Sequence, residues 1–122
     1  MKSRNTYPEK AIQFELQRQG LKFETHVASL PGTPDIVLSE LKTAIFVNGC
    51  YWHRHFNCTR VARQTIKKDY WLEQFSRIVT ADHSHFLSLQ MFGWTPVTVW
   101  ECEAINYPSR VVKKLCLHAE QN

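Results

Sequence analysis

Two thiols, two imidazoles and two large aromatic side chains lie close together in the middle of this 122-residue chain. Three of these groups, Cys50, His55 and Cys58, follow the spacing Cys-x4-His-x2-Cys. Cys102, just past a later apolar segment, is a candidate fourth ligand. A Cys3His set favours tetrahedral zinc, and a site in which protein fills every coordination position is structural. The alternative is that these cysteines are small hydrophobic residues of the core.

A second metal site is indicated by Asp35, which follows Pro34 at the start of a predicted strand. The next predicted strand ends at Val47. If the two strands are neighbours, the Asp35 carboxylate lies beside the Val47 carbonyl, and such oxygen ligands suit Mg²⁺. The alternative is that Asp35 only caps the turn after Pro34.

Asp82 lies on the apolar stripe of a long predicted helix, four residues from both Ile78 and Phe86. A carboxylate on such a face needs a partner, because burying it unpaired is costly. His53, near the predicted zinc ligands, is a candidate, and an Asp–His pair fixes the imidazole tautomer and raises its basicity for acid–base catalysis. The alternative is a structural bond to a histidine or an arginine, such as Arg77. The full stripe comprises Trp71, Phe75, Ile78, Val79, Phe86 and Leu89.

Tyr51 and Trp52 lie inside the predicted zinc loop, where ligation of Cys50 and His55 would hold both rings rigidly. Exposed aromatic rings on a rigid platform stack on bases or wedge between them. The alternative is that at least one of the two rings belongs to the core.

The remaining histidines, His26, His83, His85 and His118, have no comparable neighbours in the sequence. We expect them on the surface or in ordinary packing. Cys116 falls on the apolar stripe of the predicted final helix, so we expect it in the core, with zinc ligation in place of Cys102 as the alternative.

Apolar periodicity and turn residues define the elements that must hold these groups. Thr6 as a cap and Gly20 as a stop signal bound a first helix, with Glu9 in its opening turn. The segment 43–47 is almost wholly apolar, which is typical of a central strand covered on both faces. The predicted elements are helix 8–19, strands 21–28, 35–38 and 43–47, helix 70–92, strand 95–100 and helix 108–121. Their order predicts an α/β fold in which helices flank a central mixed sheet.

The length of the chain suits one domain over residues 1–122. The net charge of +4 and the pI near 9.0 suit a polyanionic partner, although a modest basic excess also occurs on proteins that bind none. The N-terminus lacks an apolar signal region, and the chain contains no apolar run long enough to cross a bilayer, so we expect a cytoplasmic, thiol-reducing location.

Four segments carry a specific resemblance to a known family: Asn5–Glu9, Ser29–Val37, Phe46–His55 and Val99–Cys102. They resemble the very short patch repair (Vsr) endonucleases, which nick one DNA strand at T:G mismatches and have the PD-(D/E)XK restriction-endonuclease-like fold. The similarity runs in order over about residues 3–103.

The resemblance implies a role for each candidate residue. Asp35 and the Val47 carbonyl would bind catalytic Mg²⁺, and His53, supported by Asp82, would be the catalytic histidine, with Glu9 as a further acid. The structural zinc ligands would be Cys50, His55, Cys58 and Cys102. The wedging aromatic residues would be Tyr51 and Trp52. The candidate phosphate contacts are Lys2, Arg4, Arg54, Arg60, Arg63, Lys67 and Lys68.

The implied activity is Mg²⁺-dependent hydrolysis of one phosphodiester beside a T:G mismatch. We expect a monomer on double-stranded DNA, associated with the nucleoid when bound, with accessory repair proteins as candidate partners and no membrane. Two departures from the best-known members are Val47-Asn48 in place of Thr-His and the short arm 1–5. They keep open a zinc-stabilised DNA-binding module that has lost cleavage. A restriction-type PD-(D/E)XK nuclease without mismatch specificity is the other alternative.

Overall fold

The computed structural model describes residues 6–50 and 69–120. Four strands form one mixed sheet in the order β1-β2-β3-β4. The first two pairings are antiparallel, and β3 pairs with β4 in parallel. The elements are α1 (Tyr7–Arg18), β1 (Glu24–Thr25), β2 (Ile36–Leu38), the 3₁₀ turn η1 (Ser39–Leu41), β3 (Thr43–Asn48), α3 (Asp69–Met91), β4 (Thr95–Trp100), α4 (Glu101–Asn106) and α5 (Pro108–Glu120).

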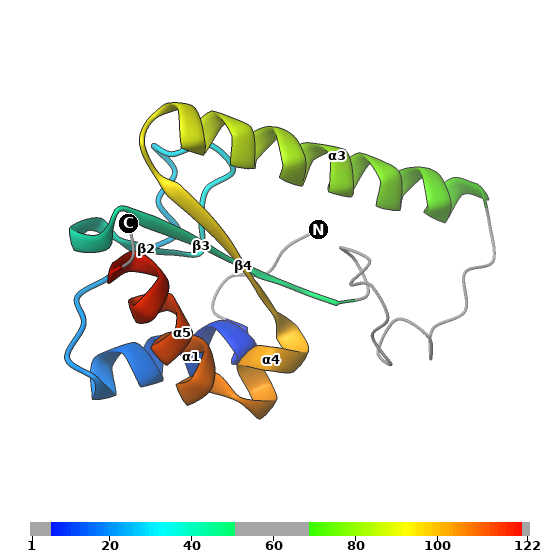
Figure 1. The fold of residues 1–122 in the computed structure, drawn as a ribbon. Coiled ribbons are helices and arrows are strands. Elements are labelled where there is room, and N and C mark those ends of the chain that lie inside the picture. Colours follow the sequence, from blue (N-terminus) through cyan, green and yellow to red (C-terminus); the bar gives the residue numbers. More distant parts are fainter. Residues whose placement is uncertain (1–5, 51–68, 121–122) are drawn as a thin grey trace.

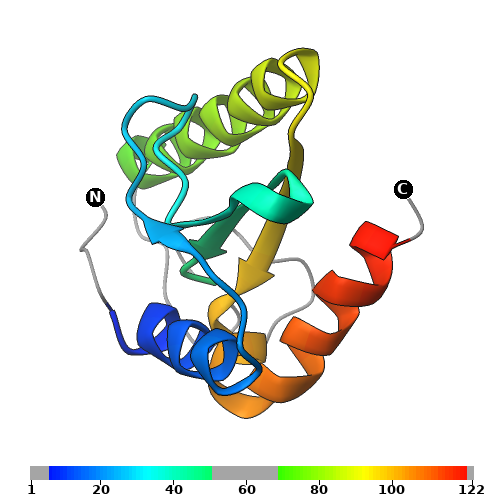
Figure 2. The same ribbon diagram turned by 90° about the vertical axis from the view of Figure 1, so that its left-hand side faces the viewer.

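Helices cover both faces of the sheet, as the sequence predicts. The long helix α3 lies along one face, and α1, α4 and α5 cover the other (Figures 1 and 2). On the three-helix face the buried core consists of Ile12, Leu16, Ile36, Leu38, Ile45, Val47, Val99, Ala104, Val112 and Leu115. On the α3 face it consists of Ala44, Phe46 and Leu89.

The central strand β3 is buried along its whole length. It lies between β2 and β4, so both of its edges are paired. Its odd and even residues feed the two opposite cores, because successive side chains of a strand point to opposite faces. The predicted apolar strand at 43–47 is therefore confirmed, and its C-terminal end becomes a fixed platform.

The ends of α1 follow the predicted signals. Thr6 is the N-cap, and its side chain accepts a hydrogen bond from the Glu9 amide at 3.5 Å. At the other end Gly20 has φ of +78°, and the Leu21 amide bonds to the Leu16 carbonyl at 3.0 Å. A glycine in this left-handed conformation commonly ends a helix. The first helix is thus held where Glu9 faces the sheet.

The observed elements differ from the predicted ones in two places. The strand expected over 21–28 is only Glu24–Thr25, because its partner β2 has three residues and the chain then turns at 30–34. The second difference is α4, six residues that follow β4 directly and were not predicted. The Trp100 amide donates to the Glu103 carboxylate at 3.1 Å, which closes the first turn of this short helix.

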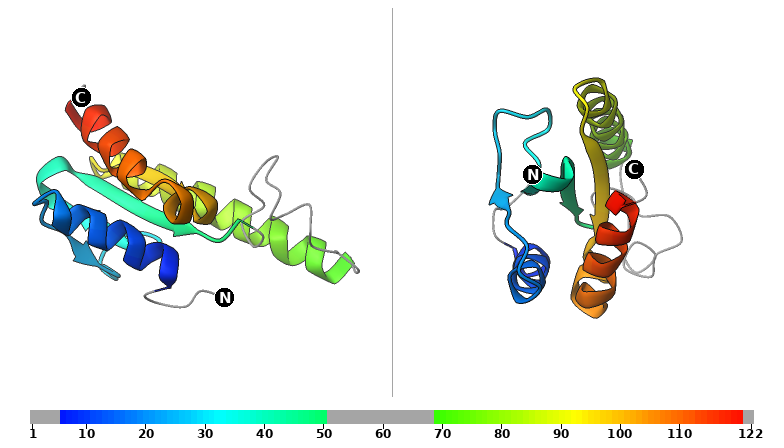
Figure 3. Two further views of the ribbon diagram at one scale, coloured as in Figure 1. Left: turned by 90° about the horizontal axis from the view of Figure 1, so that it is seen from below. Right: turned by 60° about the vertical axis from the view of Figure 1, so that its left-hand side comes forward.

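Helix α3 extends beyond the end of the sheet (Figure 3). Leu89 is fully buried near its C-terminus, whereas Val79 is 45% exposed. The apolar stripe predicted for this helix is therefore only partly buried. None of the helices among the described residues is long and apolar enough to span a membrane.

Candidate metal centre

Asp35 lies directly before β2 and is 1% exposed. Its Oδ2 accepts a hydrogen bond from the Val47 amide at 2.8 Å. The β2–β3 register ends at Ile36 and Ile45, so the carboxylate takes the place of a backbone acceptor just beyond the last paired residues. The side chain therefore reaches across to the neighbouring strand and contacts the Val47 amide, whereas the sequence predicted a position beside the Val47 carbonyl.

The Val47 amide and carbonyl belong to one extended residue. In an antiparallel ladder the N–H and C=O groups of such a residue face the same neighbouring strand. Since the N–H points to Asp35, the Val47 carbonyl faces the side of β3 on which Asp35 lies.

Glu9, in the first turn of α1, is 1% exposed. Its orientation is fixed from its own helix, because the Thr6 hydroxyl donates to Oε2 at 3.3 Å while accepting from the Glu9 amide. The other carboxylate oxygen, Oε1, lies 2.9 Å from His26 Nε2. The helix cap predicted from the sequence thus also aims an acidic side chain at the sheet.

His26 is the residue that the sequence prediction missed. Its side chain is only 11% exposed and contacts Glu9, so it lies inside the protein rather than on the surface, and no sequence motif indicated this contact. Its backbone has φ of +48°, and its amide donates to the Asp35 carbonyl at 3.0 Å. The signal is the β1–β2 register, in which Thr25 faces Ile36 and the next step brings His26 opposite Asp35. That pairing cannot be read from residue types alone.

Glu9, His26 and Asp35 form the acid–imidazole cluster, in which one ligand atom from each residue lies within 4.8 Å of the other two. Octahedral ligands about 2.1 Å from an ion are about 3.0 Å apart in cis positions and about 4.2 Å apart in trans positions. The 2.9 Å between Glu9 Oε1 and His26 Nε2 matches the cis value. One of the three separations in the cluster therefore fits two ligands of a shared octahedral ion.

The electrostatics of the acid–imidazole cluster also favour a cation. Two buried carboxylates close to one another repel when ionised, and burial strengthens this repulsion because the local dielectric constant is low. A divalent ion bound between them offsets both charges.

Asn48, the last residue of β3, is 3% exposed, and its Oδ1 has no hydrogen-bond partner among the residues that the structure describes. One further step of the β2–β3 register sets Asp35 opposite Phe46, and residues 46 and 48 share a face of the strand. Asn48 is therefore a diagonal neighbour of Asp35. A buried acceptor without a donor costs about 1–3 kcal/mol, which a bound ligand that carries a donor would offset.

Two of the predicted zinc ligands lie at the same end of the sheet. Asn48 of β3 pairs with Trp100 of β4, so Cys50 and Cys102 each follow the last paired residue by two positions. The Cys50 amide donates to the Glu101 carboxylate at 3.3 Å, which ties the two segments together. Cys50 is fully buried and Cys102 is half-buried. Cys116 packs against the core of the three-helix face, as predicted.

Asp82 is half-buried on α3 rather than buried in an apolar stripe. Its predicted partner His53 lies outside the described residues, and so do the two other proposed zinc ligands, His55 and Cys58. The same holds for the aromatic pair and the basic side chains, which are Tyr51, Trp52, Lys2, Arg4, Arg54, Arg60, Arg63, Lys67 and Lys68.

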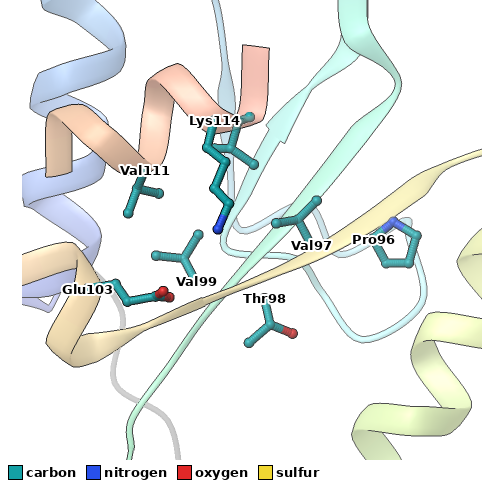
Figure 4. Close-up of a pocket in the computed structure, with 8 residues that line it drawn as sticks. Pro96, Val97, Thr98, Val99, Glu103, Val111 and Lys114 are labelled. Atoms are coloured by element: carbon teal, nitrogen blue, oxygen red, sulfur yellow. The ribbon is translucent and has the colours of Figure 1, made fainter. Parts of the chain in front are cut away.

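A small pocket lies between β4 and α5 (Figure 4). Its volume is about 280 Å³, and none of the predicted site residues lines it. Most ligand pockets are larger, at about 300–1,000 Å³, and this one cannot hold duplex DNA. The lining residues are Pro96, Val97, Thr98, Val99, Glu103, Val111, Lys114 and Leu115.

Residues 1–60 match the model of a family described as DNA mismatch endonuclease Vsr. The DNA mismatch endonuclease Vsr of Escherichia coli (strain K12) is 39% identical over 100 residues, which is 82% of this chain and 64% of that protein. This chain thus spans less than two thirds of that relative.

This chain spans a larger share of two relatives that have other names. The type II nicking enzyme V.XorIIP of Xanthomonas oryzae pv. oryzae is 37% identical over 103 residues, or 84% of this chain and 75% of that protein. The type II nicking enzyme V.NmeAIP of Neisseria meningitidis is 34% identical over 104 residues, or 85% of this chain and 74% of that protein.

Proposed function

Since this chain belongs to the Vsr family of DNA mismatch endonucleases, we propose that it hydrolyses one phosphodiester of double-stranded DNA beside a T:G mismatch. The names of its relatives support this proposal in two ways. One is a mismatch endonuclease, and two others are nicking enzymes, which favours cleavage of a single strand. We assign the mixed sheet and its flanking helices to the PD-(D/E)XK fold, as one endonuclease domain.

The observation that carries the proposal is the acid–imidazole cluster, where β2 begins and β3 ends. Asp35 and Glu9 are each 1% exposed, come from segments 26 residues apart and converge with ligand atoms within 4.8 Å. Buried carboxylates are rare unless they are paired or bind a metal. This convergence supports the metal-binding roles of Asp35 and Glu9 over a simple turn cap.

Asp35, Glu9 and the Val47 carbonyl are the groups that would hold Mg²⁺. When bound, the ion supplies Lewis-acid stabilisation of the charge that develops on the scissile phosphate and the leaving oxygen. The hydrogen bond from the Val47 amide keeps the Asp35 carboxylate in position without the ion. Asn48 Oδ1 would accept a hydrogen bond from a water at the site, which accounts for its burial without a partner among the described residues.

Acid–base chemistry is assigned to His53 and Asp82. His53 would take the proton of the attacking water or orient it, and Asp82 would hold the imidazole in the required tautomer. The half-buried position of Asp82 on α3 suits such a role, because a partly desolvated carboxylate binds an imidazole more strongly than an exposed one.

Zinc would stabilise the loop that carries His53. The proposed ligands are Cys50, His55, Cys58 and Cys102, a closed set of the structural type. Support comes from the parallel β3–β4 register, which gives Cys50 and Cys102 equivalent positions past Asn48 and Trp100. In this arrangement zinc joins the end of β3 to the start of α4.

The DNA would lie over this end of the sheet. Tyr51 and Trp52 are proposed to wedge into the base stack at the mismatch. Stacking on the bases would then supply binding energy in place of hydrogen bonds to base edges. Basic side chains would contact phosphates, which fits the net charge of +4 and predicts binding that weakens with salt. The proposed phosphate contacts are Arg54, Arg60, Arg63, Lys67 and Lys68, with Lys2 and Arg4 from the short arm. We propose that one monomer binds one mismatch.

A nicking assay tests this function. The protein is incubated in Mg²⁺ with matched and T:G-mismatched duplexes whose two strands carry different labels. Nicking of one strand of the T:G duplex alone is expected. Equal cutting of both duplexes would contradict mismatch specificity, cutting of both strands would point to a restriction-type enzyme, and binding without cutting would point to a DNA-binding module.

A further inference from the structure

We propose that His26 is a nitrogen ligand of the divalent cation held by Glu9 and Asp35, and that it gives the site a preference for Mn²⁺ over Mg²⁺. This inference rests on the metal centre of the proposed function. It goes beyond that function because it adds a third protein side chain to the site and specifies which ions the site selects.

The backbone fixes His26 at the cluster. Its amide donates to the Asp35 carbonyl at 3.0 Å, and its φ of +48° is an uncommon conformation for a residue with a side chain. Such a conformation persists when the surrounding structure imposes it. The pairing of β1 with β2 therefore places the imidazole beside the carboxylates. Only 11% of the His26 side chain is exposed.

The position of Nε2 suits a ligand. It lies 2.9 Å from Glu9 Oε1, and the three residues each offer one ligand atom within 4.8 Å of the other two. Two cis ligands of an octahedral ion are about 3.0 Å apart at bond lengths near 2.1 Å. Nε2 and Oε1 therefore already have the separation that a shared ion demands, and binding requires only that Nε2 carries no proton.

The donor set determines the ion. Mg²⁺ is bound almost entirely by oxygen, whereas imidazole nitrogen suits first-row transition ions. Mn²⁺ accepts carboxylates and waters as Mg²⁺ does and also binds imidazole nitrogen. A centre of two carboxylates and one imidazole should thus bind Mn²⁺ more tightly than Mg²⁺.

The other role open to this geometry is that His26 donates Nε2–H to Glu9 and never contacts the ion. His26→Gln separates the two roles, because the glutamine amide can still donate to Glu9 but offers no nitrogen ligand. His83→Gln, at an exposed position of α3, is the matched control.

Calorimetric titration of the full chain with MnCl₂ and with MgCl₂ tests the proposal. We expect wild type and His83→Gln to bind Mn²⁺ at least about tenfold more tightly than Mg²⁺, and His26→Gln to lose about tenfold or more of that ratio. An unchanged ratio in His26→Gln overturns the proposal. The melting temperature of each variant checks that it remains folded.

Pulsed electron paramagnetic resonance of the Mn²⁺-loaded wild type tests the proposal on the unaltered protein. Coupling of the ion to a directly bound imidazole nitrogen is expected. As a control, this coupling should disappear in His26→Gln. A spectrum without such a coupling in the wild type overturns the proposal.

Asp35→Asn distinguishes failure of this inference from failure of the proposed function. Loss of both Mn²⁺ and Mg²⁺ binding in Asp35→Asn, together with an unchanged ion ratio in His26→Gln, removes only the ligand role of His26. Unaltered binding of both ions in Asp35→Asn removes the metal centre itself.

Discussion

The Val47 amide donates a hydrogen bond to Asp35 Oδ2 at 2.8 Å, and this contact ties the candidate catalytic acid to the central strand. The backbone of Asp35 is held as well, since its carbonyl accepts from the His26 amide at 3.0 Å. Asp35 is thus fixed through both its side chain and its backbone, by β3 and by the segment after β1. A catalytic acid attached in this way keeps its position before metal or DNA arrives, which is the preorganisation that metal-assisted hydrolysis requires.

Gly32→Ala should destabilise the protein more than Gly20→Ala. Both glycines have φ of +78°, so alanine pays the left-handed backbone cost of about 1–2 kcal/mol at each. At Gly32 an added Cβ would also lie 2.8 Å from the His85 ring, whereas at Gly20 it meets nothing within 4 Å. Overpacking adds about 1–3 kcal/mol at Gly32. Urea unfolding of the two variants measures the difference.

The double variant Gly32→Ala/His85→Ala serves as the control for that contact. Removing the ring should recover part of the stability lost in Gly32→Ala. Equal losses at the two glycines would show that His85 does not constrain the turn before Asp35.

Leu89→Ala should weaken the packing of α3 on the sheet. The Leu89 side chain is fully buried between α3 and the sheet, and a cavity at such a site lowers the free energy of unfolding by about 2–5 kcal/mol. Leu87, on the same helix, is 49% exposed, so Leu87→Ala should change the free energy of unfolding by no more than about 0.5 kcal/mol. Similar values for the two variants in denaturant unfolding would refute this packing.

The proposed zinc site predicts about one zinc ion per purified chain. Cys102→Ser should lower the zinc content and the melting temperature, since the ligand at the start of α4 is lost. Cys116→Ser is the comparison, because Cys116 packs against the core rather than at the end of β3. Elemental analysis decides the question, and a zinc-free wild type or full zinc retention in Cys102→Ser would rule out the site.

We expect Glu15 to account for part of the stability that the protein loses in acid. Hydrogen bonds from Arg18 and then Gln19 lower the pKa of Glu15 in the folded protein. The contribution of Glu15 is therefore complete above about pH 4.3, the ordinary pKa of glutamate, and is lost as the pH falls below it. Glu15→Gln should lose less stability than wild type over this acid range.

Melting temperatures measured from neutral pH into this range test the role of Glu15, with the exposed Glu40→Gln as the control. If wild type and Glu15→Gln lose stability in parallel, the Glu15–Arg18 interaction does not contribute to the acid sensitivity.

The fold was predictable where a single segment carries its own signal. The apolar run at 43–47 indicated a central strand, and Thr6 and Gly20 marked the ends of α1, because capping and burial depend on local residue types. α4 was missed, since a helix of six residues is too short to display a clear apolar period.

The candidate metal centre was only partly predictable for a different reason. Asp35 could be selected from its position before a predicted strand and Glu9 from the family resemblance, but His26 joins them through the pairing of β1 with β2. The register of that pairing depends on the tertiary structure, and β1 itself has only two residues. His26 has no candidate site residue near it in the sequence, but in the fold it lies beside Glu9 and Asp35.

The most direct test of the central claim is single-turnover nicking of a T:G duplex in Mg²⁺ by wild type and Asp35→Asn. Binding of the same duplex is followed by fluorescence anisotropy. If the acid–imidazole cluster holds the catalytic metal, Asp35→Asn should bind the duplex within a few-fold of wild type and nick it at least about 100-fold more slowly. Nicking by Asp35→Asn at a rate close to that of wild type would contradict the assignment of this cluster as the catalytic centre.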